Sequence, residues 1–309
     1  MNAPIQSTPG NTRNGIRAPA QSAPGKTFTF SSGRKQVPAM TVLYGPPGIG
    51  KTTFARQARA RSVFIDLEGG TNQFDVSRID DVSTWAEVCA AVQQLTTAEH
   101  PFKLLVIDTL DKLEWLLWQH IFHTVGNGKG QPVTSIEQVG GGFGKGYQCA
   151  VEEFRRLIGL CDALRRTRGV GVMFLAHGKI ANVTNSDASA ADFARWELKV
   201  DKRLAGLLLE AADNVWYAHR PTVVMRSSNE RERTRADLNT VRVIGVEETG
   251  GYAAKNRYGL TGTLPMDWGT VLSAMEKARE TATTPPVPAA PQTTTDDTIP
   301  AEGSATTQE

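Results

Sequence analysis

Residues 45–52 read Gly-Pro-Pro-Gly-Ile-Gly-Lys-Thr, and they fit the pattern G-x-x-x-x-G-K-[ST] at every fixed position. The stretch lies between a short apolar segment, residues 40–44, and a segment with helical character that starts near Thr52. Its three glycines let backbone N–H groups turn toward a phosphate without interference from Cβ atoms. A strand, such a loop and a helix in this order predict a site for a nucleoside triphosphate.

Each part of this loop has an expected role. Lys51 can reach the β- and γ-phosphates, and the hydroxyl of Thr52 can ligate Mg²⁺. We therefore expect ATP and Mg²⁺ as cofactors. A chance Gly/Pro-rich loop is the alternative, and the agreement of motif with context disfavours it. The residues expected to contact the nucleotide are Gly45, Pro46, Pro47, Gly48, Ile49, Gly50, Lys51, Thr52 and Thr53.

The two ends of the 309-residue chain differ in composition from its centre. Residues 1–26 are rich in Pro, Ser, Thr, Asn and Gly, and residues 281–309 are rich in Pro and Thr, with acidic residues near the end. Such segments bury too little apolar surface to offset the entropy lost on ordering. We predict a disordered N-terminal tail (1–26), one nucleotide-binding domain (27–280) and a disordered acidic tail (281–309).

Composition helps to judge whether the chain is a nucleic-acid-binding, disulfide-rich, zinc-binding or membrane protein. The formal net charge is +2, which neither requires nor excludes a nucleic-acid partner. The three cysteines lack C-x-x-C spacing, which argues against a disulfide framework or a zinc site, and we expect Cys89 and Cys161 to be buried in helices. No apolar run approaches the length of a membrane span, so we expect a cytoplasmic protein without a membrane partner.

Strand and helix patterns alternate along the centre of the chain. Strands are expected at residues 63–67, 103–108 and 170–176, and helices at 84–95, 110–123, 148–166 and about 201–212. This alternation predicts an α/β fold with a mostly parallel, doubly wound sheet that binds ligands at the carboxyl ends of its strands. Antiparallel strands are expected at one edge near the C-terminus, at residues 223–226, 241–246 and 251–254.

Polar side chains stand where these strands end. Asp108 could hold Mg²⁺ through water, with capping of the following helix as the alternative. Glu68 could deprotonate a water aimed at the γ-phosphate, and Asp66 competes for this role. His177 could contact the γ-phosphate or the attacking water, or it could be structural.

The order of these features resembles that of RecA-like P-loop ATPases, over about residues 38–262. It looks closest to the phage members, ATP-binding proteins related to single-strand-annealing recombinases. The resemblance implies that Glu68 is the catalytic base and that His177 is a nucleotide sensor, at a position usually occupied by Gln in RecA. It also implies an ATPase that acts on single-stranded DNA in phage recombination or replication, by annealing or strand exchange, in the host cytoplasm.

Residues 254–259 read Ala-Lys-Asn-Arg-Tyr-Gly and resemble the Lys-Asn-Arg-Phe-Gly signature of RadA-type and DnaB-like ATPases. There the Lys and Arg reach into the nucleotide site of the neighbouring subunit, which implies head-to-tail assembly as a ring or filament. In an extended segment Lys255 and Arg257 face the same way, so both could reach one triphosphate. A solvated basic turn before Gly259 is the alternative.

Two segments contain candidate contacts for single-stranded DNA. Residues 124–147 are expected to form a long glycine-rich loop whose lysines and aromatic rings suit phosphate neutralisation and base stacking. A mobile lid, with Tyr147 packed at the start of the next helix, is the alternative. The loop at 178–203 adds further cations. The candidates are Lys129, Phe143, Lys145, Tyr147 and Lys179.

A third group of cations lies on the predicted helix between these two segments. We expect its arginines to form a solvated helix face: Arg155, Arg156, Arg165, Arg166 and Arg168.

Two other functions fit part of this pattern. The first is an ATP-gated DNA-binding assembly protein with little turnover. The second is a P-loop small-molecule kinase. The kinase is disfavoured because the sequence shows no second substrate pocket or Arg-rich phosphate lid, and because the Lys-Asn-Arg element has no obvious role in one.

Overall fold

A computed structural model describes residues 30, 32–33, 35–58, 61–183, 192–221 and 241–281. The chain forms two units, Met1–Gln36 and Val37–Glu309. The few described residues of the first unit form neither a helix nor a strand. The predicted tails lie outside the described residues, except that Thr281 is the last residue of helix α6 (Trp268–Thr281).

Parallel strands form the centre of the second unit. The described strands make one sheet in the order β10-β8-β7-β1-β5-β4-β2-β3, in which β6 also pairs with β5 and β9 with β7. All pairs from β7 to β3 are parallel, as predicted. Their bounds are β1 (Met40–Gly45), β2 (Ser62–Asp66), β3 (Ser77–Arg78), β4 (Leu104–Asp108), β5 (Gly171–Val183) and β7 (Asn214–His219).

Antiparallel strands lie at the β7 edge of this sheet, which confirms the predicted fold class. β8 (Val243–Gly245) and β9 (Lys255–Asn256) pair with β7, and β10 (Thr263–Pro265) pairs with β8. The strand predicted at residues 223–226 lies outside the described residues. Residues 251–254 contribute isolated bridges through Tyr252 rather than a strand.

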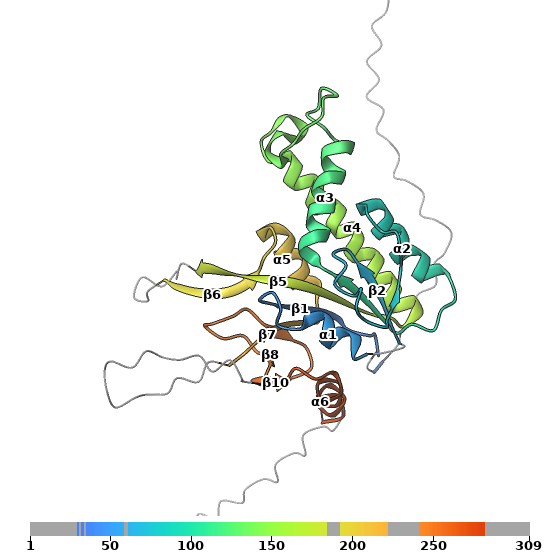
Figure 1. Ribbon diagram of the computed structural model, residues 1–309, viewed down its shortest axis with the longest axis vertical. Coiled ribbons are helices and arrows are strands. Elements are labelled where there is room, and N and C mark those ends of the chain that lie inside the picture. Colours follow the sequence, from blue (N-terminus) through green and yellow to red (C-terminus); the bar gives the residue numbers. More distant parts are fainter. Residues whose placement is uncertain are drawn as a thin grey trace, which may run out of the picture. The chain divides into compact units, whose positions relative to one another are not determined.

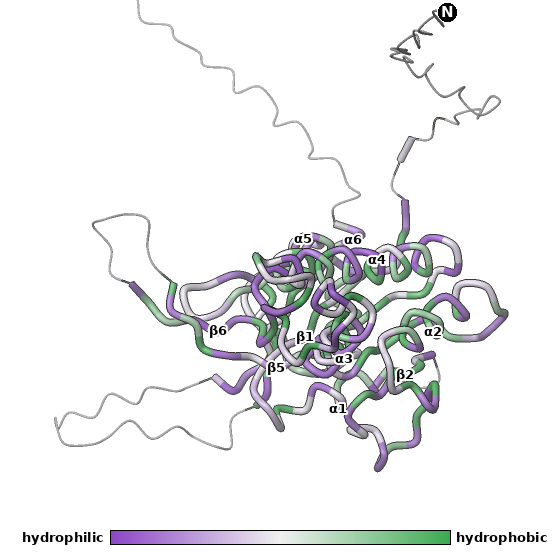
Figure 2. Tube along the Cα trace, turned by 90° about the horizontal axis from the view of Figure 1, so that it is seen from above, coloured by the Kyte–Doolittle hydropathy of each residue, from purple (hydrophilic) through white to green (hydrophobic). Residues whose placement is uncertain are grey.

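Helices cover both faces of the sheet (Figure 1). One face carries α2 (Trp85–Thr97), α3 (Leu110–Thr124), α4 (Lys145–Arg168) and α5 (Lys202–Ala211), and the other carries α1 (Lys51–Arg56) and α6. In Figure 2 the colour changes repeatedly along the helices, as expected for helices with one buried face. Within the described ranges, no helix is both long enough and apolar enough to cross a membrane.

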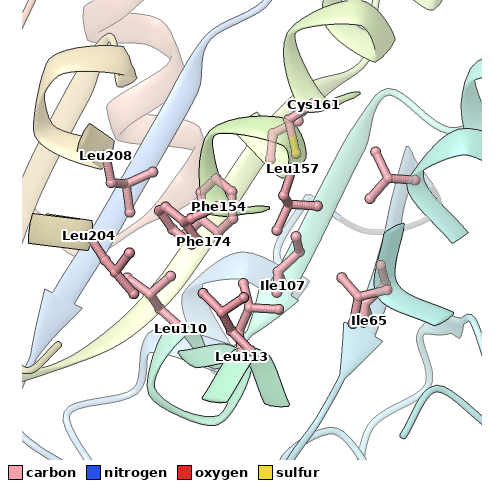
Figure 3. Packing of buried hydrophobic residues seen from close by; sticks show 14 of the residues in the cluster. Ile65, Ile107, Leu110, Leu113, Phe154, Leu157, Cys161, Phe174, Leu204 and Leu208 are labelled. Atoms are coloured by element: carbon pink, nitrogen blue, oxygen red, sulfur yellow. The ribbon is translucent and has the colours of Figure 1, made fainter. Parts of the chain in front are cut away.

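The two faces have separate cores because successive strand residues point to opposite sides of a sheet. Val42 lies in the larger core and its neighbour Leu43 in the smaller one. In the larger core, Phe154 of α4 packs beside Phe174 of β5, with leucines of α3 and α5 around them (Figure 3). Both faces of the central strands are therefore covered, which explains the unbroken apolar runs of β1 and β4.

The helix caps follow local sequence signals. Thr84 and Glu87 form the predicted capping box of α2: Glu87 N donates to Thr84 Oγ1 at 3.3 Å, and Thr84 N donates to Glu87 Oε2 at 2.8 Å. Thr109 caps α3, because its hydroxyl accepts from Lys112 N at 3.4 Å. Thr109, and not Asp108, is therefore the residue that caps this helix.

Strand β5 is longer than predicted. It continues to Val183 and pairs antiparallel with β6 (Phe193–Leu198). The prediction of a loop over residues 178–203 is therefore wrong, because β6 and the start of α5 occupy much of that range. The pairing with β6, the next strand along the chain, satisfies the backbone groups of the part of β5 that extends beyond β1 and β4.

Residues 124–147 are also more structured than predicted. They contain a 3₁₀ helix, η2 (Ile136–Gly141), and α4 begins at Lys145. A Cβ on Gly146 would clash with Ile136 O, so glycine is needed where η2 and α4 meet. Figure 1 shows this segment at the end of the α3–α4 pair that lies farthest from the sheet.

The arginines of α4 divide into two groups. Arg155, Arg156 and Arg166 are exposed, as predicted. Arg165 is only 7% exposed, so the prediction of a solvated side chain is wrong for this residue. Its guanidinium donates to Pro38 O at 2.7 Å and pairs with Asp213.

The remaining arginine of α4 is half-buried: Arg168 donates to Ala98 O at 2.6 Å. Cys89 and Cys161 are buried in helices, as predicted, and burial raises their pKa values to about 11 and about 12.

Candidate nucleotide-binding site

The loop between β1 and α1 depends on its glycines. Gly48 and Gly50 have φ values of 73° and 102°, which side chains with a Cβ rarely adopt. Gly45 has a different reason, since a Cβ there would clash with Ala218 O of the neighbouring strand β7. Without these three glycines the backbone could not follow this path and present its N–H groups to a phosphate.

Lys51 is only 7% exposed, which is unusual for a lysine. Its Nζ donates to Gly45 O and Pro46 O, each at 3.2 Å, so the side chain lies against its own loop. Burial lowers the pKa of Lys51, and the nearby charges of Asp108, Asp111 and Glu68 oppose this effect. The ammonium is therefore close to three carboxylates, and a bound phosphate can replace its two carbonyl acceptors.

Thr52 and Asp108 form the candidate metal site. Thr52 Oγ1 donates to Asp108 Oδ2 at 2.6 Å. Burial raises the pKa of Asp108 to about 6, against the opposing hydrogen bond from Thr52. Gly70 keeps the space beside this pair open, because a Cβ there would lie 3.5 Å from Asp108 Oδ2 and 3.7 Å from Thr52 Oγ1.

This arrangement fits Mg²⁺. The ion prefers hard oxygen ligands, keeps several waters and usually takes only one or two protein ligands beside substrate phosphates. The hydroxyl of Thr52 and the carboxylate of Asp108 are ligands of this kind. Among the described residues, no group of three or more His, Cys, Asp or Glu side chains could hold a metal.

Asp66, the competitor of Glu68, is fully engaged in holding its own loop. Its carboxylate accepts from the backbone N–H groups of Glu68 at 3.2 Å, Gly70 at 3.1 Å and Thr71 at 2.8 Å, and from Thr71 Oγ1 at 2.5 Å. Burial alone would raise the pKa of Asp66, but the hydrogen bonds, led by those from Thr71, lower it. A carboxylate with four donors is a poor acceptor for a further proton.

Glu68 has a different environment. It is exposed, and its Oε1 accepts one hydrogen bond, from Thr109 Oγ1 at 2.9 Å. Its charge acts on both Lys51 and Asp108, so it lies near the loop and the candidate metal site. Of the two acids, Glu68 is the one whose surroundings leave room for a water.

His177 lies beside the first residue of the phosphate-binding loop, because β1 and β5 pair Gly45 with His177. Its backbone N donates to Asp111 Oδ2 at 2.8 Å, and its ring Nδ1 lies 3.3 Å from the same oxygen. The prediction that His177 stands at the end of a strand is wrong, because β5 continues to Val183 and His177 lies within it. His177 is nevertheless next to the loop, and it contacts the first turn of α3.

Lys255 and Arg257 lie toward the other end of the sheet. Arg257 Nη1 donates to Asp213 Oδ1 at 3.1 Å, and Asp213 N donates to Met40 O. Met40 and Gly45 are the two ends of β1, about 16 Å apart at roughly 3.3 Å per residue. The structure therefore does not bring Arg257 to the phosphate-binding loop of its own chain.

Lys255 is bound to the end of a helix. Its Nζ donates to Leu209 O at 2.7 Å and Glu210 O at 3.2 Å, in the last turn of α5. Lysine at a helix C-terminus compensates carbonyl groups that lack partners within the helix. A structural role is thus present for Lys255 within one chain.

Three of the five candidate DNA contacts are exposed side chains near the end of the α3–α4 pair. Lys129 and Lys145 are exposed. Phe143 is 99% exposed and has a φ of 55°, between Gly142 and Gly144. An aromatic ring that makes so little contact with its own chain is available to a partner.

The other two candidates already have partners. Tyr147 donates through its hydroxyl to Glu137 Oε1 at 2.8 Å, and the guanidinium of Arg203 lies 4.1 Å from the centre of its ring. Lys179 Nζ donates to Val200 O at 3.2 Å. Both side chains therefore help to hold neighbouring segments together.

Several residues at the site are not predicted by the sequence patterns. Thr109 and Asp111 hold Glu68 and His177, and Arg242 Nη1 donates to Ile49 O of the loop at 3.3 Å. Thr109 and Asp111 follow Asp108 closely in sequence, so their position was a usable signal. Arg242 offered none, because it lies just before β8, 193 residues along the chain from Ile49.

The chain is similar to a known protein family over the residues of this site. No curated protein matches the chain. Among solved structures, the crystal structure of the RadB recombinase has a TM-score of 0.37 and 12% sequence identity, over 73% of this chain and 85% of that chain. A protein-family model described as an AAA domain matches residues 37–258, which include the phosphate-binding loop, Glu68, Asp108 and His177. Since this match covers most of the chain, the protein belongs to the AAA domain family and is a P-loop ATPase domain.

Proposed function

We propose that the protein is a RecA-like, Mg²⁺-dependent ATPase that assembles head to tail and acts on single-stranded DNA in phage recombination or replication. The observation that carries hydrolysis is the grouping of Lys51, the Thr52–Asp108 pair and Glu68 at one end of the parallel sheet. Ligands bind at this end of such sheets.

Each group of residues at the site has a separate role in hydrolysis. Backbone N–H groups of residues 45–52 and the ammonium of Lys51 stabilise charge on the phosphates. Thr52 and Asp108 would hold Mg²⁺, which when bound neutralises charge on the phosphate oxygens. Glu68 accepts a proton from the attacking water, and the hydrogen bond from Thr109 fixes the rotamer of Glu68 while it does so.

His177 senses the γ-phosphate in this proposal. Its register beside Gly45 supports the role, because that position borders the loop. Lys199 N donates to His177 O at 2.9 Å, just after β6. A shift of His177 on loss of the phosphate would therefore be felt where the β5–β6 hairpin meets α5.

Lys255 and Arg257 act on the nucleotide of a neighbouring chain in this proposal. Two observations support it: Arg257 is separated from its own loop by the length of β1, and its side chain is 56% exposed. Phosphate is a stronger acceptor than the carbonyls that now bind Lys255. A head-to-tail contact of this kind is heterologous and produces rings or filaments.

Single-stranded DNA would bind the exposed side chains of Lys129, Phe143 and Lys145. Two lysines and an exposed ring supply the charge and the stacking surface that such binding needs. Tyr147 and Lys179 are weaker candidates, because DNA would have to displace Glu137 and Val200 O from them.

ATP hydrolysis measured with and without single-stranded DNA tests the proposal. We expect Mg²⁺-dependent turnover that single-stranded DNA stimulates and that duplex DNA of the same length stimulates less. Nucleotide binding and assembly without turnover would instead identify an ATP-gated assembly protein. Transfer of phosphate to a small molecule, with no response to DNA, would identify a kinase and contradict the proposal.

A further inference from the structure

A carboxylate that the predicted site does not include lies directly against His177. Asp111 is in the first turn of α3, and its side chain is 15% exposed. Its Oδ2 accepts from His177 N at 2.8 Å and lies 3.3 Å from His177 Nδ1. One oxygen therefore contacts both the backbone and the ring of the same histidine.

This contact selects one form of the imidazole. An ionised carboxylate only accepts hydrogen bonds, so it favours the form of His177 that has its hydrogen on Nδ1, the ring nitrogen 3.3 Å from Asp111 Oδ2. A neutral His177 then has its hydrogen on Nδ1 and a free lone pair on Nε2, on the far side of the ring. The tautomer of a histidine is commonly set by the hydrogen bond that its other nitrogen makes.

Asp111 also lies close to the expected phosphates. Its charge acts on Lys51, as do those of Asp108 and Glu68. Its second oxygen, Oδ1, is buried and has no hydrogen-bond partner in the described residues. Leaving a buried acceptor unpaired is costly, so a purely structural carboxylate would be expected to satisfy both oxygens.

Helix capping does not account for Asp111. A carboxylate in the first turn favours a helix, but the cap of α3 is already made by the hydroxyl of Thr109. The other acid of this helix segment, Glu114, has a different partner: its Oε1 accepts from Asp201 N at 2.6 Å, at the start of α5. Glu114 is therefore a matched carboxylate on the same helix that does not contact His177 through any hydrogen bond between described residues.

We propose that Asp111 is a positioning residue for His177. It holds the ring with Nδ1–H toward the carboxylate, so that the lone pair of Nε2 is offered to a hydrogen-bond donor such as the attacking water, whereas a contact from Nε2 to the γ-phosphate needs a second proton on the ring. The role of Nε2 rests on the proposed ATPase function, whereas the orientation of the ring does not. The same contact ties β5 to the first turn of α3, which begins directly after Asp108 and Thr109.

Nitrogen NMR of the chain with ¹⁵N-labelled histidine tests the orientation without any turnover. The spectrum of the nucleotide-free protein is recorded above the pH at which histidine titrates, and the His177 signals are those that vanish in His177→Gln. We expect the hydrogen on Nδ1 in the wild type. In Asp111→Asn the amide can also donate, so we expect a mixture of tautomers. Glu114→Gln should leave the signals unchanged. A wild-type His177 with its hydrogen on Nε2 overturns the proposal, whatever any variant does.

Steady-state kinetics test the consequence. Asp111→Asn should lower kcat by at least about tenfold, part of the 10²–10⁴-fold that oriented proton donors and acceptors contribute, and leave KM within about twofold. Glu114→Gln should change neither. Unchanged kcat in a folded Asp111→Asn protein contradicts the positioning role. A wild type without ATPase activity refutes the proposed function instead, and the tautomer measurement still decides the orientation of His177.

Discussion

The hydroxyl of Thr109 donates a 2.9 Å hydrogen bond to Oε1 of Glu68, which joins the N-cap of α3 to the loop after β2. Two residues later, Asp111 binds His177 of β5. The start of one helix therefore contacts the two residues proposed as base and sensor, directly after the candidate metal ligand Asp108.

Two replacements of Thr109 test the hydrogen bonds that its hydroxyl makes with Glu68 and Lys112. Thr109→Val keeps the shape of the side chain and loses the hydroxyl. It should lower kcat because Glu68 is no longer held, and it should destabilise the fold by about 1 kcal/mol through loss of the cap. Thr109→Ser should keep both properties near the wild type. ATPase assays and thermal melts check this, and equal turnover of the Val and Ser variants would show that the Glu68 contact is dispensable.

Glu68→Gln and Asp66→Asn should fail in different ways. Glu68→Gln should bind Mg²⁺-ATP normally and hydrolyse it about 10²–10⁴-fold more slowly, because the amide cannot accept the proton. Asp66→Asn should lose stability first, by about 1–3 kcal/mol, because an amide nitrogen would face N–H donors of its own loop. Nucleotide titrations, turnover rates and melting curves distinguish them. Loss of turnover in a stable Asp66→Asn protein, with normal turnover in Glu68→Gln, would reverse the assignment.

The ionised carboxylate of Asp108 should destabilise the folded chain, although the residue is the candidate metal ligand. Burial raises the pKa of Asp108 to about 6 from its ordinary value of 3.8. The carboxyl group therefore loses its proton more readily in the unfolded chain than in the folded one. The penalty is absent below pH about 4, grows as the pH rises through about 6, and is complete above pH 7. In the presence of a chelator, Asp108→Asn should therefore have a free energy of unfolding higher than that of the wild type at pH 8, by on the order of 1 kcal/mol. This difference in stability should become smaller toward pH 5. The same variant should lose Mg²⁺-dependent hydrolysis. A destabilised Asp108→Asn protein at pH 8 would refute the penalty.

Mixing variants tests action between chains. The double variant Lys255→Ala/Arg257→Ala should bind ATP normally and hydrolyse it poorly, and Lys51→Ala should lose hydrolysis because the phosphate contact is absent. Mixed together, the two proteins should recover activity, since some interfaces pair an intact loop with intact cations. Lys103→Ala, at an exposed lysine just before β4, is the control and should behave as wild type.

The double variant also needs a stability control. Lys255 contacts carbonyls of α5 and Arg257 contacts Asp213, so its melting curve must show that the fold survives. Turnover per chain should rise with protein concentration at low concentration. A monomer whose mixtures never recover activity would leave these two residues with only their structural contacts.

Binding of single-stranded DNA should depend on salt through the two lysines. Each phosphate contact contributes about −0.7 to the slope of log K against log salt, so Lys129→Ala/Lys145→Ala should make the slope shallower by up to about 1.4. Phe143→Ala should weaken binding by about 1–3 kcal/mol with little change in slope, because it removes stacking rather than charge. Fluorescence anisotropy at several salt concentrations measures both. Wild-type protein that fails to bind at low salt with a non-hydrolysable ATP analogue would exclude this role.

Local patterns predicted the elements around the loop with small errors. The strand before residues 45–52, the capping box at Thr84 and the strand that ends in Asp108 were all visible because their signals lie within a few residues of each other. The errors arose where a residue's surroundings depend on a partner segment outside its own local pattern. Strand β5 continues to Val183 because β6 pairs with it. Arg165 is buried because its guanidinium forms an ion pair with Asp213, which is far along the chain.

The sequence by itself determined the phosphate-binding loop, the alternation of parallel strands with helices along the chain and the acids that follow the strands. These properties depend on backbone conformation and on burial of a strand on two faces, and both leave a short-range pattern. Only the tertiary structure decided how the acids differ, since Asp66 accepts four donors from its own loop while Glu68 faces Thr109. It also decided that β9 pairs with β7, which separates Arg257 from the loop of its own chain. The physical reason is that a side chain takes its role from the groups packed against it, and those groups come from segments that only the folded chain brings together.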